Sequence, residues 1–170
     1  MPEDLRQADG DTAVPDPIFK TGTTTVNVHF LHYRPELGKE ANLYVNTLFG
    51  TQQPYTATID PETGKASFSF LQCGTAKAAV VLNNSAAGSA WLAPGETTEL
   101  YVDMRALGYY LSLRREEKKK TTYPAPFQRL YSSGTYANLN NIDNQLDNSP
   151  YYGMDLFTGE FAAVSYTHLR

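Results

Sequence analysis

The sequence has only one cysteine, Cys73, among its 170 residues. A single cysteine cannot form a disulfide within the chain, and it leaves no C-x-x-C pair for thiol redox chemistry or zinc binding. Because Cys73 lies beside Gly74 in a predicted turn after an apolar strand, we expect it to be a small packed residue and not a nucleophile. We therefore predict that this chain is not itself a redox enzyme.

Long apolar runs and an excess of positive charge are absent too. No stretch approaches the roughly 20 apolar residues of a membrane-spanning helix, so we expect no membrane span. The formal net charge of −4 repels phosphate backbones and argues against nucleic-acid binding. One basic run is interrupted by Glu116 and Glu117, and we interpret it as the solvated end of a helix. Its members are Arg114, Arg115, Lys118, Lys119 and Lys120.

Groups that could carry catalysis or bind a metal are few and scattered. On a strand, His29 and His32 would face opposite sides because their positions differ by an odd number, and His168 is distant in sequence. Asp60 and Glu62 fall in a predicted turn, and no G-x-S-x-G motif is present. We therefore predict no catalytic residue, no cofactor-binding residue and no metal ligand.

The segment 140–148 is rich in asparagine and aspartate, whose oxygens are suitable ligands for calcium. It lacks the glycine and the terminal glutamate of a calcium loop. Its apolar residues have the spacing of a helix face. The pattern therefore favours a helix over a calcium site.

What the sequence does contain is a series of short alternating segments. Residues 1–20 hold three prolines and no periodicity, which indicates an extended linker. From Thr23 onward, apolar and polar residues alternate and put Val26, Val28 and Phe30 on one face. Seven such segments, separated by turns rich in Gly, Pro and Asn, predict a mainly β fold, an antiparallel β-sandwich of about seven strands over residues 21–103. After the first, they cover approximately 41–48, 55–59, 66–70, 76–83, 88–92 and 97–103.

The clearest hairpin pattern lies between residues 55 and 70. Pro61 presets one turn dihedral, and Gly64 can adopt the positive φ that a hairpin bulge requires. We expect 55–59 and 66–70 to be the two strands of a hairpin. Phe68 and Phe70 should then face the core.

The period changes to a helical one after Asp103, a residue type favoured as a helix N-cap. Met104, Leu107 and Leu111 form one apolar stripe, which predicts a helix from 104 to about 118. A second helix is predicted at about 135–147. We therefore interpret 104–163 as a helical connector that follows the sandwich.

Aromatic residues are abundant, with 12 tyrosines, 8 phenylalanines and one tryptophan. Tyr44, Tyr55 and Tyr101 are expected on the outer faces of strands, where rings could stack on sugars. A carbohydrate-binding or adhesin-like sandwich is therefore one interpretation of these residues. The alternative interpretation is structural: the rings build the core and cross-strand pairs.

The order of several segments resembles the amino-terminal domain of TlpA-type thioredoxin-like thiol–disulfide oxidoreductases of Gram-negative envelopes. The likeness covers about 18–161, and its most specific part is the turn and strand that end at Asp103. The segments that carry it are 17–23, 43–46, 66–70, 92–97, 102–103, 131–141 and 152–156.

In that family a β-sandwich precedes a helical connector and a thioredoxin domain with the C-x-x-C pair. This chain has no C-x-x-C, so the resemblance implies a non-catalytic accessory domain that docks a protein partner or the thioredoxin domain itself. It also implies a periplasmic or outer-envelope location if the full-length protein carries a signal sequence, and Asp11-Thr12-Ala13 matches a short O-glycosylation pattern of such proteins. Residues 164–170 resemble translated sequencing-adapter read-through, so we expect the natural protein to continue past Ala163.

Overall fold

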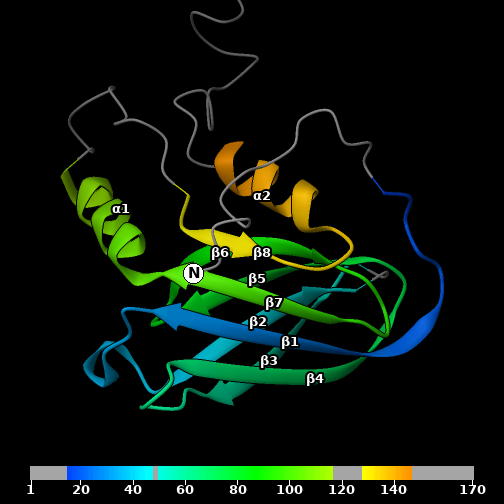
Figure 1. Cartoon of the computed structure of the whole chain (residues 1–170), viewed down its shortest axis with the longest axis horizontal. Helices are drawn as coiled ribbons and strands as arrows, with labels where there is room; N and C mark the ends of the chain where they lie inside the picture. Colours follow the sequence, from blue (N-terminus) through cyan, green and yellow to red (C-terminus); the bar gives the residue numbers. More distant parts are fainter. Residues whose placement is uncertain (1–14, 48–49, 117–127, 147–170) are drawn as a thin grey trace, which may run out of the picture.

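The computed structural model describes residues 15–47, 50–116 and 128–146, apart from the side chains of 113–116 and 146. Within them, eight strands form two four-stranded sheets that face each other (Figure 1). Sheet A contains, in spatial order, β4 (Lys65–Cys73), β1 (Thr21–Leu31), β7 (Thr97–Asp103) and β8 (Leu130–Ser132). Sheet B contains β3 (Gln52–Thr58), β2 (Glu40–Asn46), β5 (Ala76–Leu82) and β6 (Ser85–Leu92).

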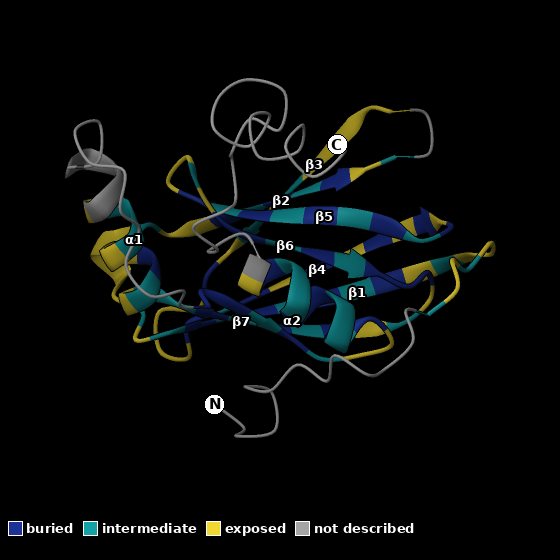
Figure 2. Ribbon diagram, turned by 90° about the horizontal axis from the view of Figure 1, so that it is seen from above, coloured by how far each residue is buried: buried dark blue, intermediate teal, exposed yellow. Residues whose placement is uncertain are grey.

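The core lies between the two sheets and follows the alternation of the sequence. Val26, Val28 and Phe30 of β1 are buried, and so are Leu43 and Val45 of β2. Figure 2 shows the same alternation of buried and partly exposed residues along the strands. The predicted mainly β sandwich is confirmed, with seven strands between residues 21 and 103.

One pair of strands departs from the antiparallel expectation. β1 and β7 run parallel, whereas the other pairs in both sheets are antiparallel. A parallel pair requires the chain to cross over between them. Here the crossover consists of all of sheet B together with β4.

The predicted hairpin between residues 55 and 70 is wrong. The turn itself forms, because Gly64 N–H donates to the Asp60 carbonyl at 2.8 Å and Gly64 adopts φ +66°. However, β3 pairs with β2 in sheet B, whereas β4 pairs with β1 in sheet A. The turn therefore leads the chain across the core from one sheet to the other. Phe68 and Phe70 are buried as expected.

Both predicted helices are present. α1 (Met104–Glu116) begins after Asp103, whose carboxylate accepts the N–H groups of Arg105 and Ala106 at 2.9 and 3.2 Å. Leu107 is buried against the core. Positions 117 and 118 of the prediction lie outside the described residues.

α2 (Ala137–Leu146) lies along the side of the sandwich formed by β6 and β8 (Figure 1). Together with β8, it attaches the segment expected to be a connector directly to the sandwich. A short 3-10 helix, η2 (Pro35–Leu37), precedes β2. None of the helices described is long and apolar enough to span a membrane.

Parts of the predicted terminal segments also have a defined place. At the end of the expected linker, Ile18 N–H donates to Thr75 Oγ1 and Thr75 N–H donates to the Ile18 carbonyl, at 2.8 and 2.9 Å. Residues 1–14, which include Asp11-Thr12-Ala13, and the predicted tail 164–170 lie outside the described part of the chain.

Candidate functional site

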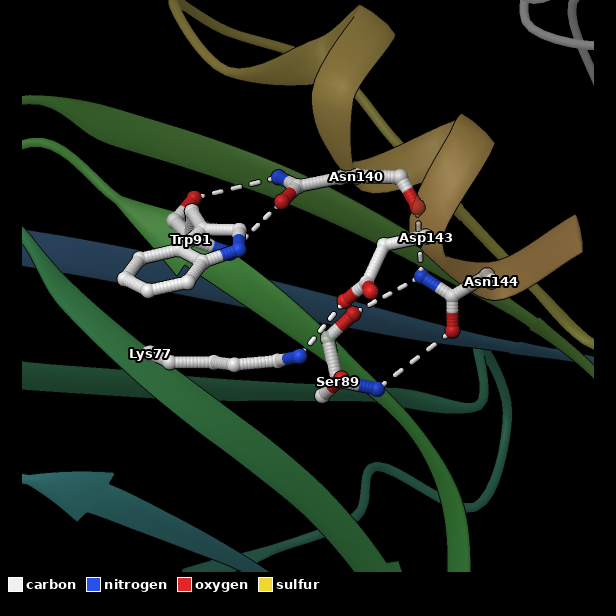
Figure 3. A network of polar contacts seen from close by, with 6 residues as sticks. All are labelled: Lys77, Ser89, Trp91, Asn140, Asp143 and Asn144. Carbon is white, nitrogen blue, oxygen red and sulfur yellow. Dashed lines mark hydrogen bonds and ion pairs between the residues drawn. The ribbon is translucent and has the colours of Figure 1, made fainter. Parts of the chain in front are cut away.

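Each sheet of a sandwich has two edges, and the edge of β6 is closed by side chains of α2. Asn140 accepts the N–H of Trp91 at 2.6 Å and donates to its carbonyl at 3.0 Å (Figure 3). One helical turn later, Asn144 accepts the N–H of Ser89 at 3.4 Å and donates to its carbonyl at 2.7 Å. The two side-chain amides thus form the hydrogen bonds that the backbone of a neighbouring strand would form with β6.

The spacing of helix and strand makes this substitution possible. Residues four apart in a helix are displaced by about 6 Å along its axis. Residues two apart in a strand are displaced by about 6.6 Å. Asn140 and Asn144 can therefore each meet one of two successive outward-facing residues, Trp91 and Ser89.

Other contacts hold α2 close to the sheet. Lys77 Nζ of β5 lies 2.6 Å from Asp143 Oδ2, and the same nitrogen lies 5.6 Å from the centre of the Trp91 ring (Figure 3). A Cβ at Gly88 would lie 2.5 Å from Asn144 Oδ1 and 2.8 Å from Leu130 Cβ. The glycine is therefore required for the close approach of helix and strand.

The edge of β8 is closed in the same manner. Asn141 Oδ1 accepts the N–H of Ser132 at 3.0 Å, and Gln128 Nε2 donates to the Leu130 carbonyl at 2.8 Å. The amide side chains on this side therefore bond outward backbone groups of both edge strands, at Ser89 and Trp91 of β6 and at Leu130 and Ser132 of β8. We interpret them as structural groups.

The opposite side of the sandwich, where β3 and β4 are the edge strands, contains a cleft of about 320 Å³. Its floor includes Tyr55 and Phe70, whose rings stack with centroids 4.5 Å apart. Gln72 is buried and fixed by donating to the carbonyls of Gly74 and Leu92 at 2.8 and 2.9 Å. The lining residues are Val45, Asn46, Thr47, Thr51, Gln53, Tyr55, Phe70, Leu71, Gln72, Cys73 and Ala76.

The lining residues of this cleft are suited to binding. They include no carboxylate, imidazole, ammonium or guanidinium group, and their titratable groups are the phenol of Tyr55 and the thiol of Cys73. Leu71 is 69 % exposed at the rim. The chemistry available is apolar contact together with hydrogen bonds from amides and hydroxyls.

Cys73 is at the rim of the same cleft and is exposed, so the expectation of a packed cysteine is wrong. The strand alternation explains the difference, because Phe70 and Gln72 point inward and their neighbours outward. Cys73 Sγ lies 3.3 Å from Thr21 Oγ1.

A second group of polar side chains lies on the outer face of sheet A. Ser67 donates to Asn27, Asn27 donates to Glu99 Oε1 at 2.6 Å, and His29 Nε2 lies 2.6 Å from Glu99 Oε2. The His29 ring stacks on Tyr101 with centroids 4.8 Å apart. We call these five residues the outer-face network.

The network determines the protonation of Glu99. Its partial burial raises the pKa, but hydrogen bonds from His29 and Asn27 and the charges of His29 and Lys65 lower it by more. The net pKa is below the ordinary value, so Glu99 is held as a carboxylate. Ser67 does not contact His29 but reaches Asn27, so the network lacks the serine–histidine contact of a hydrolytic triad.

The remaining predicted positions are dispersed. His32 lies in the turn after β1 with φ +61°, apart from His29 in the strand, and His168 lies outside the described residues. Asp60 accepts the N–H groups of Glu62 and Thr63, which lowers its pKa and fixes the turn. No group of three His, Cys, Asp or Glu side chains that could hold a metal occurs among the residues described.

The three tyrosines expected on outer faces do not form one surface. Tyr101 is on the outer face of sheet A and Tyr44 on that of sheet B. Tyr55 packs against the core, so its predicted placement is wrong. A planar aromatic platform is therefore not assembled from these three rings.

The sequence analysis above does not predict that the asparagines of α2 close an edge. The sequence signal for this role is that Asn140, Asn141 and Asn144 share one helix face. A polar stripe on that face indicates a buried partner with many hydrogen-bonding groups. An edge strand is such a partner.

The chain matches no protein-family model, and no curated protein matches it either.

Proposed function

We propose that this chain is a non-catalytic docking domain of an envelope thioredoxin-like protein, which binds a polypeptide partner and positions it for an attached redox domain. A tethered docking surface makes the redox encounter intramolecular and so raises the effective concentration of the partner. The family part of this proposal is supported by the order of sequence segments described above. If the full-length protein carries a signal sequence, the proposed location is the periplasm or outer envelope.

The observation that carries the docking role is the cleft between β3 and β4. It is open at the rim, where Leu71 and Cys73 are exposed, and its floor is the Tyr55–Phe70 stack. An apolar side chain of a partner would fit such a floor, while Gln53 and Asn46 could bond its backbone. A lining that holds no carboxylate and no imidazole supports binding over catalysis.

The first test is insulin reduction by dithiothreitol, followed by turbidity. We expect no acceleration by this chain, and a thioredoxin-like rate would overturn the proposal. The second test is binding to fluorescein-labelled, reduced and carboxymethylated α-lactalbumin, followed by anisotropy. This probe presents an extended polypeptide without thiols.

Ala76→Leu and Ala79→Leu form a matched pair for the binding test. Ala76 lines the cleft, whereas Ala79 is on the outer face of the same strand. We expect Ala76→Leu to fill the cleft and weaken binding about tenfold, which corresponds to roughly 1.4 kcal/mol. Equal binding by both variants would show that the cleft is not the docking site.

A carbohydrate-binding function is the second candidate, and the outer-face network favours it. Tyr101 lies beside an amide, a carboxylate and an imidazole, a combination that can stack on and hydrogen-bond to a sugar. A glycan array tests this function. Binding that is lost in Tyr101→Ala would support it, and the absence of any signal above background would remove it.

A further inference from the structure

The direction of the backbone groups on β4 follows from its register with β1. Phe30 N–H donates to the Gly64 carbonyl, so even-numbered residues of this pair face each other with hydrogen bonds. The N–H and C=O groups of odd-numbered β4 residues therefore point to the free edge. The outward carbonyl of Lys65 already has a partner, because it accepts the N–H of Asp60 at 2.9 Å. The outward groups that follow belong to Ser67, Ser69, Leu71 and Cys73.

The other edge on this side, β3, is blocked by a proline. Thr47 N–H donates to the Thr51 carbonyl, so odd-numbered residues of β3 bond to β2 and even-numbered residues point outward. Pro54 occupies an outward position and has no N–H to offer. With β6 and β8 covered by amide side chains, β4 is the edge that the described residues leave open to strand addition.

We propose that the free edge of β4 is a dimerisation surface on which the β4 strand of a second copy of this chain pairs in antiparallel orientation. The inference goes beyond the docking function and does not depend on it. The two copies of sheet A would join into one eight-stranded sheet across a twofold axis.

If all four outward residues form hydrogen bonds with the second copy, the twofold axis passes at Phe70. Ser67 then lies opposite Cys73 of the second copy, and Ser69 lies opposite Leu71. The two Leu71 side chains become diagonal neighbours on the same face, within reach of each other. Each would cover the other, which accounts for a leucine that is 69 % exposed in one copy.

Charge and position are both compatible with a second copy. The paired stretch from Ser67 to Cys73 has no charged side chain, so self-pairing brings no like charges together. α2 lies on the opposite side of the sandwich from β4 and stays at the far side of each copy (Figure 1). Because Leu71 and Cys73 also line the cleft, the two clefts would lie side by side near the axis.

Sedimentation equilibrium of the full chain over a wide concentration range tests the proposal. We expect the mass to rise from the 18.9 kDa of one chain to twice that value. Leu71→Lys places two cations beside the axis and should keep the chain monomeric. Leu37→Lys is the control, because Leu37 is also an exposed leucine, in η2, and this variant should dimerise normally.

Disulfide trapping tests the register. In Ser67→Cys, the new thiol would lie opposite the natural Cys73 of the second copy, at a Cα separation of about 5.5 Å that suits a disulfide. Within one copy these residues are about 20 Å apart along β4 and cannot react. Mild oxidation should therefore give covalent dimers with Ser67→Cys but not with the double variant that also carries Cys73→Ser. A monomer at every concentration, or equal trapping in both variants, would overturn the proposal, whatever the outcome of the polypeptide-binding test.

Discussion

Individual charged side chains in this protein are used to fix the geometry of strands and turns. Asp60 accepts two backbone N–H groups in the turn between the sheets, and Glu99 joins β7 to β1 through Asn27 and His29. In each case the hydrogen bonds stabilise the ionised form and lower the pKa of the carboxyl group. A lowered pKa is therefore no evidence of catalysis at these positions. It does make the stability dependent on pH.

Glu99→Gln should make this dependence visible in urea unfolding. A lowered folded-state pKa means that ionised Glu99 stabilises the fold fully above the ordinary glutamate pKa of about 4.3. This contribution is lost as the pH falls through the lower folded-state pKa. We expect the variant to be less stable by up to about 1 kcal/mol near neutral pH, since the pair is partly exposed, and to approach the unsubstituted chain in strong acid. Glu62→Gln, at an exposed turn position, is the control, and a pH-independent difference for Glu99→Gln would contradict the assignment.

Gly88 is a second position where one residue decides the local structure. Because Gly88 has no Cβ, Asn144 and Leu130 can lie close to β6. A methyl group at this position would lie 2.5 Å from Asn144 Oδ1 and 2.8 Å from Leu130 Cβ. We expect Gly88→Ala to lower the free energy of unfolding by about 1–3 kcal/mol, as overpacking does elsewhere. Gly108→Ala in α1 is the matched control, because nothing lies within 4 Å of the Cβ it would add. It should be neutral or stabilising, and equal losses in both variants would rule out a steric cause.

At the scale of elements, strand alternation and helix periodicity were sufficient to predict the type and approximate bounds of β1 to β7, α1 and α2. They were not sufficient to predict which strands pair. The Asp60–Gly64 turn reverses the chain whether the two strands pair or cross the core, so its residues could not distinguish the two outcomes. The pairing of β3 and β4 depends on strands outside the turn, since β4 pairs with β1 and β3 pairs with β2. β8 was missed because three residues are too few to show a period.

The covering of the β6 edge by side-chain amides of α2 leads to a prediction about stability and hydrogen exchange. Asn140→Ala would leave the N–H and C=O of Trp91 without their partners, and Asn144→Ala would do the same to Ser89. We expect a loss of about 1–3 kcal/mol of stability for each variant. Native-state hydrogen exchange should be faster at the Trp91 amide in the first and at the Ser89 amide in the second.

Asn46→Ala is the control for this pair, because its hydrogen bond with Gln52 lies at the surface. It should change stability by less than about 0.5 kcal/mol. If both α2 variants accelerated exchange uniformly over β6, the helix would act only as a hydrophobic cover. Residue-specific acceleration would show that each amide serves one strand position.

For the whole molecule, the four sheet edges of the described strands differ in whether their outward backbone groups are covered, and this difference underlies the proposed associations. Two edges are closed by amides of α2 and Gln128, and a third by Pro54, while β4 keeps outward N–H and C=O groups beside the cleft. Exposed edges favour aggregation, so among the described strands the closure of three edges leaves β4 as the one proposed for association. Polypeptide binding and dimerisation are therefore both expected on the β3–β4 side. The surface on the α2 side should remain free of strand pairing.

Pro54→Thr tests whether the closure of β3 limits the size of the assembly. Threonine has a high strand propensity and would add an N–H to the row of outward groups on β3, so that two edges on one side could accept strands. We expect light scattering to show particles larger than those of the unsubstituted chain, increasing with concentration. Pro61→Thr, in the exposed turn outside the strands, is the control and should leave the size distribution unchanged. An unchanged size for Pro54→Thr would mean that side-chain packing along β3, and not the missing N–H, prevents pairing at this edge.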